Sequence, residues 1–228
     1  MKYLFADTAN LVDIKSLVSM GIIQGVTTNP SIISKEPKQN FDALIEELWI
    51  FCVDHNLPLS VEVFTDRTDD IIRQGKEISL KLMRLRSRND LLYIKVPIGI
   101  QEISAIYQLS QSGIRVNCTC CYTAEQMQLA ASAGAKYVSI FYNRLKDIGG
   151  DPSAVTSKVK NFINDNNLEC QIIAGSIRKS SDLSEAWSTG SDIVTCSPAI
   201  IINSLFHEKS KESADQFLID FKTWIGNS

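Results

Sequence analysis

The fold of this chain is constrained most by a regular alternation of strand-like and helix-like segments along its whole length. Short runs rich in Val, Ile and Tyr are each followed by a segment with apolar residues at helical spacing. The expected strands cover residues 2–7, 22–28, 59–64, 91–97, 115–121, 137–142, 169–176 and 193–197. The expected helices cover residues 9–20, 41–55, 69–86, 101–111, 124–133, 153–164, 182–189 and 199–207. Strands that are joined by helices pair in parallel.

Eight strands and eight helices in strict alternation predict a closed (β/α)8 barrel, the TIM barrel of the α/β class. A chain of 228 residues has the length of one such domain, so residues 1–228 are expected to form a single barrel. Gly21 and Gly113 fall just past helix-like segments, where glycine often ends a helix. An open doubly wound sheet is the rival architecture, but no G-x-G-x-x-G motif follows the first strand.

One further segment follows the eighth helix. Residues 212–226 place Phe217, Phe221 and Trp224 at helical spacing, which predicts an additional C-terminal helix with an apolar stripe. This helix either closes the bottom of the barrel or docks on a neighbouring subunit. The sequence leaves both arrangements open.

Composition and charge narrow the function classes. The chain is 44% hydrophobic and 21% charged, as is usual for globular proteins, and its net charge of −3 lacks the basic footprint of nucleic-acid binding. Only a few apolar residues separate Lys2 from Asp7, so no signal peptide is expected. No apolar run reaches the length of a membrane span. We therefore expect a cytoplasmic protein without nucleic-acid or membrane partners.

The cysteines invite a zinc hypothesis that their spacing does not favour. Cys118, Cys120 and Cys121 do not form a C-x-x-C pair, no second cluster follows, and His55 and His207 are distant in the sequence. Reduced and mostly buried thiols are the preferred interpretation.

Lys95 is the most informative single residue, because it interrupts the apolar run 91–97. Burial of an ammonium group is costly unless it is paired, and a lone lysine of this kind is more often structural. A neutral, desolvated lysine amine is also the nucleophile that forms Schiff bases with carbonyl carbons. Side chains alternate along a strand, so Tyr93, Lys95 and Pro97 share the face that points into the barrel.

The same alternation places polar side chains on the inward face of several strands. The inward residues are predicted to be Tyr3, Phe5 and Asp7; Ser60, Glu62 and Phe64; Asn117 and Thr119; Ser139 and Phe141; and Ala174, Ser176 and Arg178. A single inward carboxylate is usually an ion-pair partner. Two carboxylates, a lysine and several hydroxyls near the C-terminal ends of barrel strands predict a site instead. Carboxylates in different surroundings can divide proton delivery and removal between them. Arg144, Ser176 and Arg178 are donors of the kind that hold a phosphate.

Four motifs resemble the transaldolases, in particular the short-chain branch that also contains fructose-6-phosphate aldolase. They are the strand ending at Asp7, Thr27-Thr28-Asn29-Pro30-Ser31, Tyr93-Ile94-Lys95-Val96-Pro97 and Gly175-Ser176-Ile177-Arg178, and the resemblance runs over essentially the whole chain. It implies that Lys95 forms a Schiff base with a keto sugar phosphate. It further implies that Asp7 accepts the proton of the C4 hydroxyl as the C3–C4 bond breaks, while Glu62 and Thr119 hold the water that shuttles protons.

The resemblance also implies a substrate-binding set and a reaction. The set is Thr28, Asn29 and Asn117, of which the two asparagines match residues that bind the dihydroxyacetone hydroxyls; Phe141; and Ser139, Arg144, Ser176 and Arg178 at phosphate-site positions. The implied function is a transaldolase of the pentose phosphate pathway that acts on sugar phosphates without a diffusible cofactor. The implied assembly is a homo-oligomer, a pentamer or decamer with the terminal helix exchanged.

Two alternatives to transaldolase remain at this stage. A fructose-6-phosphate aldolase would release free dihydroxyacetone, but family aldolases tend to carry Gln in place of Glu62 and Tyr in place of Phe141. A barrel that only binds sugar phosphates would not require Lys95, Asp7 and Glu62 together. The segment 143–151, with two glycines before the next helix, is expected to be a loop that moves over the substrate.

Overall fold

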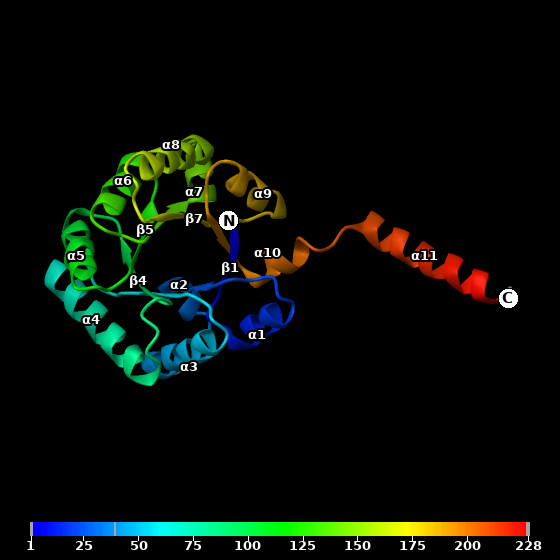
Figure 1. Cartoon of the computed structure of the whole chain (residues 1–228), viewed down its shortest axis with the longest axis horizontal. Coiled ribbons are helices and arrows are strands. Elements are labelled where there is room, and N and C mark those ends of the chain that lie inside the picture. The colour runs from blue at the N-terminus through cyan, green and yellow to red at the C-terminus, as the bar shows by residue number, and fades with distance from the viewer. Residues whose placement is uncertain (1, 39, 227–228) are drawn as a thin grey trace.

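The strands form a closed parallel barrel, as the alternation predicts (Figure 1). The computed structural model describes residues 2–38 and 40–226. Within them the barrel follows chain order from β1 to β8 and closes where Tyr3 of β1 pairs with Ile193 of β8. The eight strands are β1 (Tyr3–Asp7), β2 (Val26–Thr27), β3 (Leu59–Glu62), β4 (Leu92–Pro97), β5 (Val116–Cys121), β6 (Tyr137–Phe141), β7 (Gln171–Gly175) and β8 (Ile193–Cys196).

Helices surround the barrel, and short extra helices follow some strands (Figure 1). The helices in the described residues are α1 (Leu11–Ser19), α2 (Pro30–Ile33), α3 (Phe41–Asp54), α4 (Thr68–Leu85), α5 (Ile100–Gln111), α6 (Ala124–Ser132), α7 (Tyr142–Asp147), α8 (Pro152–Asp165), α9 (Ser180–Ser188), α10 (Pro198–Asn203) and α11 (Glu208–Gly226). The expectation of a loop over 143–151 is wrong for its first part, because α7 occupies it. The short helix α2 was not expected from the sequence.

Side-chain caps explain where several helices begin. The side chains of Asn10 and Asn40 accept hydrogen bonds from the first free backbone N–H groups of α1 and α3. Thr123 and Gln126 form a reciprocal capping box at the start of α6. After α1, Gly21 adopts a φ of +69°, a left-handed conformation that residues with a Cβ rarely take. This confirms the predicted helix end.

Large side chains fill the lower half of the barrel interior, meaning the half toward the N-terminal ends of the strands. Phe5, Tyr93, Tyr137, Ile173 and Ile193 form one buried cluster there. The rings of Tyr93 and Tyr137 stack with centroids 3.9 Å apart, and Phe5 meets Tyr137 edge-on at 6.3 Å. This cluster lies between two spaces. A pocket at the N-terminal ends of the strands reaches Phe5 and Tyr137 from one side, and a separate cavity lies toward the C-terminal ends.

The predicted inward positions are wrong at Ala174 in β7 and at Phe64 after β3. In β7, Ile173 joins the inner cluster and Ala174 packs in the outer core against the helices, so Ala174 does not point inward as expected. The strand ends at Gly175, and Ser176 follows with a left-handed φ of +60° that departs from strand geometry. Phe64 lies beyond the end of β3, is 44% exposed and packs edge-on against Phe41, so it does not enter the barrel.

The last helix leaves the barrel. α11 begins at Glu208, earlier than the expected residue 212, and projects away from the barrel body (Figure 1). Every described residue of α11 is exposed, including Phe217 and Phe221. The helix therefore does not close the bottom of the barrel within this chain. In the described residues, no helix is both long and apolar enough to cross a membrane.

Candidate active site

A cavity opens at the C-terminal end of the barrel, where the strands place their last inward side chains. Its volume is about 270 Å³, and it is lined by Asp7, Asn29, Pro30, Ser31, Glu62, Lys95, Cys120, Phe141, Arg144 and Ser176. A smaller chamber of about 30 Å³ shares several of these residues and adds Thr27, Asn117, Thr119, Ser139 and Thr195. This chamber has room for a water molecule but not for a phosphate group.

Lys95 and Glu62 form a buried ion pair in this cavity. They are register partners on β4 and β3, and 3.2 Å separates the Lys95 Nζ from the Glu62 Oε2. The side chains are only 8% and 11% exposed. The Lys95 Nζ also donates a hydrogen bond of 3.0 Å to the backbone carbonyl of Thr28. The ammonium is thus paired, as burial demands, and it still borders open space.

The pKa values of the two carboxyl groups are both raised. For Glu62 burial is the main cause, opposed by the charge and hydrogen bond of Lys95, while the charge of Asp7 raises the pKa further. For Asp7 burial again dominates, opposed by the charge of Lys95, a hydrogen bond from Thr27 and the charge of Lys35. Both groups therefore take up protons more readily than they would in water. Such shifts are frequent where proton transfer occurs.

Asp7 is held in place by two threonines, Thr27 and Thr195, that were not expected at the site. The Thr27 hydroxyl donates a 2.7 Å hydrogen bond to Asp7 Oδ1 and lies 2.6 Å from the hydroxyl of Thr195. Thr195 lies two residues beyond the inward Ile193 on β8. Extending the inward alternation to this strand would have identified it.

A second polar chain crosses the floor of the small chamber. The Asn117 amide donates to the Ser60 hydroxyl at 3.1 Å, and the Ser139 hydroxyl donates to Asn117 Oδ1 at 2.7 Å. Thr119 lines the same chamber. Ser139 is therefore placed to orient Asn117.

A bulge in β5 adds Cys120 to the cavity. The register between β5 and β6 shifts between Cys118 and Cys121, and Cys120 takes a left-handed φ of +62°. Regular alternation predicts that Cys120 faces the helices, so no sequence signal indicated its position. The six cysteines are free thiols. Within residues 2–38 and 40–226, no three His, Cys, Asp or Glu side chains are grouped as metal ligands.

Of the residues predicted to bind phosphate, Arg144 and Ser176 line the cavity and Arg178 does not. Arg144 lines the cavity, with its guanidinium 4.4 Å from the ring centre of Phe141, and Ser176 lines the cavity as well. Arg178 is not among the lining residues and instead forms a two-point pair with Asp147, at 2.9 Å and 2.6 Å. Thr28 is fully buried and does not line the cavity; its hydroxyl donates to the Ser60 carbonyl.

Fold and site together define a (β/α)8 barrel with a lysine–carboxylate centre at its strand ends. Residues 4–225 match the model of a family described as Transaldolase/Fructose-6-phosphate aldolase, and the chain belongs to this family. A probable transaldolase from Nitrosopumilus maritimus (strain SCM1) is 37% identical over 220 residues, which cover 96% of this chain and 94% of that protein. Probable transaldolases from Thermoplasma volcanium and Roseiflexus castenholzii are 34% and 33% identical, over 96% and 97% of this chain and 95% and 97% of those proteins.

Proposed function

We propose that the protein is a transaldolase that transfers a dihydroxyacetone unit through a Schiff base on Lys95. In this reaction sedoheptulose 7-phosphate and glyceraldehyde 3-phosphate give erythrose 4-phosphate and fructose 6-phosphate, as in the pentose phosphate pathway. The observation that carries the proposal is the Lys95 amine, which borders the cavity, is paired with Glu62 and interacts with the charge of Asp7. Lysine amines form imines with ketones. Family membership favours this reaction over other lysine chemistry.

Imine formation begins with a proton transfer from Lys95 to Glu62. The raised pKa of Glu62, caused mainly by burial, favours this transfer. The neutral amine then attacks the C2 carbonyl of the ketose, and the amine proton moves to the carbonyl oxygen. Glu62 returns its proton to that hydroxyl, which leaves as water, and a protonated imine remains. Thr119 lines the adjoining chamber, and this position supports a role for its hydroxyl in holding the water.

Cleavage of the sugar follows, with Asp7 as the base. Asp7 accepts the proton of the C4 hydroxyl, the C3–C4 bond breaks, and its electron pair forms an enamine while the imine nitrogen becomes neutral. The aldose product leaves, and the enamine then attacks the carbonyl carbon of the acceptor aldose phosphate. Asp7 gives its proton to the new hydroxyl, and hydrolysis of the imine frees Lys95.

The binding roles follow the placement of the side chains. Asn29 lines both parts of the cavity and Asn117 lines the lower one, which supports contacts with the hydroxyls of the three-carbon unit. Arg144 and Ser176 lie at the larger opening and are proposed to bind the phosphate. Arg178 reaches the phosphate in this scheme only if it exchanges Asp147 for that partner.

Fructose-6-phosphate aldolase activity is the second candidate, and it differs in the fate of the enamine. An aldolase protonates the enamine and releases dihydroxyacetone. Phe141 lines the cavity and has no hydroxyl with which to position a protonating water, which favours retention of the enamine. Glu62 and Phe141 are also the residues expected of a transaldolase at these positions, where family aldolases tend to carry Gln and Tyr.

Borohydride trapping with fructose 6-phosphate tests the lysine chemistry. A stable mass adduct on Lys95 is expected, and the absence of any adduct contradicts an enzyme of this type. The two candidate reactions are separated by measuring free dihydroxyacetone with and without erythrose 4-phosphate. A transaldolase turns over only with the acceptor, so rapid release without it identifies the aldolase.

The assembly and the cellular location are also proposals. We propose a pentameric or decameric homo-oligomer in which α11 packs on a neighbouring copy, since Phe217 and Phe221 are 71% and 56% exposed on a helix that projects from its own barrel. Analytical sedimentation tests this, and a monomer contradicts it. We propose a cytoplasmic location, which the six free thiols support.

A further inference from the structure

Helix α7 joins the candidate phosphate-binding residues to a polar network behind the cavity. The helix is only six residues long, and no side chain caps its N-terminus. A helix this short is not stable by itself, so its position depends on tertiary contacts. α7 contributes Arg144 to the cavity, so the position of Arg144 depends on the same tertiary contacts.

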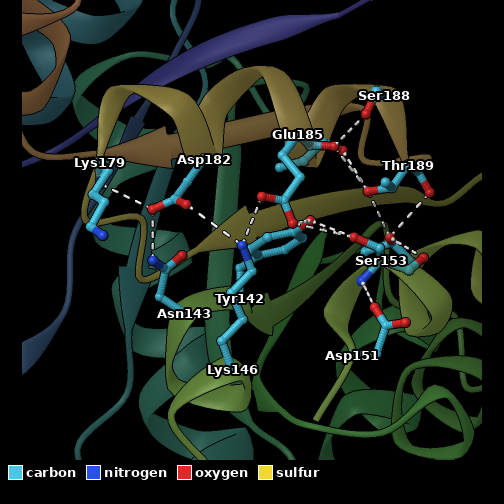
Figure 2. Close-up of polar contacts among 12 residues, drawn as sticks. Tyr142, Asn143, Lys146, Asp151, Ser153, Lys179, Asp182, Glu185, Ser188 and Thr189 are labelled. Carbon is cyan, nitrogen blue, oxygen red and sulfur yellow. Dashed lines mark hydrogen bonds and ion pairs between the residues drawn. The ribbon is translucent and has the colours of Figure 1, made fainter. Parts of the chain in front are cut away.

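Four of the six residues of α7 contact α9 or the segment before it. The Tyr142 hydroxyl lies 3.2 Å from Glu185 Oε1, and the Lys146 Nζ lies 2.8 Å from Glu185 Oε2. Asn143 donates to Asp182, and Asp147 pairs with Arg178. Figure 2 shows Tyr142, Asn143 and Lys146 converging on Asp182 and Glu185 from below. Arg144 is left facing the cavity.

Asp182 links the two parts of the candidate phosphate site. Its Oδ2 accepts a 2.6 Å hydrogen bond from the Asn143 amide on α7 and a 3.0 Å hydrogen bond from the backbone N–H of Lys179 (Figure 2). Lys179 follows Ser176 and Arg178 in the β7–α9 connection, so one carboxylate spans both elements. Asp182 is only 6% exposed.

The Asn143 side chain depends on this one partner. It is buried, and its Oδ1 has no hydrogen-bond partner among the described residues. The bond to Asp182 is therefore the polar contact that fixes the amide, and a charged acceptor makes it stronger than a neutral one. Burial acts to raise the pKa of Asp182, but Asn143, Lys179 N–H and Lys146 outweigh it, so the pKa is lowered and the group is ionised at neutral pH.

We propose that Asp182 is a positioning residue for sugar-phosphate binding, which holds Arg144 on α7 at a fixed place relative to Ser176. The inference rests on the proposed function, because it assigns the phosphate to these two residues. Asp182 itself does not line the cavity. Its loss affects recognition of the phosphate group and leaves the chemistry of Lys95 intact.

Asp182→Asn and Asn143→Ala test the inference from the two sides of the bond. The readout is the ketose concentration that gives half-maximal borohydride adduct, measured for fructose 6-phosphate and for dihydroxyacetone, which lacks a phosphate. We expect the value for fructose 6-phosphate to rise roughly tenfold in both variants, because small displacements of binding groups have effects of this size or more. The value for dihydroxyacetone should not change.

Asp192→Asn is the matched control. Asp192 is also buried, and its carboxylate likewise accepts from one side chain, Lys160 at 2.7 Å, and one backbone N–H, Ile172 at 2.9 Å. It precedes β8 and lies at the opposite end of the barrel. This variant should keep both half-maximal concentrations. If Asp182→Asn does not fold, Asn143→Ala decides, because it leaves the Asp182–Lys179 contact in place.

The outcomes separate this inference from the proposed function. If the wild-type protein forms no adduct with either ketose, the proposed function fails. If the wild-type protein forms adducts and the values for Asn143→Ala match those of Asp192→Asn, the positioning role of Asp182 is overturned. A selective rise for the phosphorylated ketose supports it.

Discussion

The lower and upper halves of the barrel interior are built by the same strands in opposite ways. β1 contributes Phe5 below and Asp7 above, and β4 contributes Tyr93 below and Lys95 above. The lower side chains stack closely, whereas the upper ones are charged and border a cavity. A step of two residues along a strand thus separates a layer that stabilises the fold from a layer that carries chemistry.

The contrast implies that the upper layer exists at some expense to stability. The pKa values of Asp7 and Glu62 are raised chiefly by burial, which means that their ionised forms are disfavoured in the folded protein. Cys120 and Ser176 are not glycines, yet they hold left-handed backbone conformations beside the cavity. Asn56 and Asn167 also hold left-handed conformations, and asparagine is among the residue types that tolerate them best.

The largest expected effect is the loss of turnover when the upper layer loses its lysine. Lys95→Met should lower kcat by roughly a thousandfold or more, because it removes the proposed covalent nucleophile. Tyr93→Phe is the matched change on the same strand and should keep kcat near the wild-type value. Circular dichroism should show both variants folded. Residual activity near wild type in Lys95→Met means that the nucleophile is another residue.

The next effect in size is expected in the lower layer and concerns stability. Tyr137→Ala removes the ring that contacts both Tyr93 and Phe5, and should reduce the free energy of unfolding by roughly 3 to 5 kcal/mol. Denaturant unfolding measures this change. Below the unfolding temperature, the variant should still form the borohydride adduct. Loss of the adduct in a folded variant would show that the two layers are not separable.

The sequence predicted most of the barrel and the centre of its site, because both depend on short-range patterns. The alternation of strand-like and helix-like segments predicted the eight strands. The alternation of side chains between the two faces of a strand predicted that Asp7, Glu62 and Lys95 point into the barrel. The failures share a physical cause. The bulge at Cys120 and the left-handed turn at Ser176 are local departures from strand geometry that no periodicity encodes.

The sequence could not predict which arginine lines the cavity and which pairs with a carboxylate. Arg178 and Arg144 are both arginines near strand ends, yet only Arg144 lines the cavity, because α7 brings Asp147 within reach of Arg178. The segment containing α7 carries two glycines and was expected to be a loop; its helix depends on contacts with Asp182 and Glu185 that form only in the folded barrel. Such tertiary contacts override local preference.

The smallest expected effect is a gain in stability when Asp7 loses its charge. Because the folded pKa of Asp7 lies above its ordinary value of 3.8, the folded state binds more protons than the unfolded state between these two pH values. The wild-type free energy of unfolding therefore falls as the pH rises through this window. Asp7→Asn removes that loss, so it should unfold at a higher temperature than wild type at pH 7, with a gain of about 1 kcal/mol.

The pH dependence distinguishes this electrostatic gain from a change in packing. The advantage of Asp7→Asn should shrink as the pH falls toward 3.8, where the wild-type carboxyl is protonated in both states. Asp192→Asn is the contrasting variant, since its carboxylate pairs with Lys160 and accepts from Ile172 N–H, and it should be less stable than wild type at pH 7. Thermal unfolding across this pH range measures both. If Asp7→Asn is as destabilising as Asp192→Asn at pH 7, the upper layer contributes to stability as the lower end does, and the division between them fails.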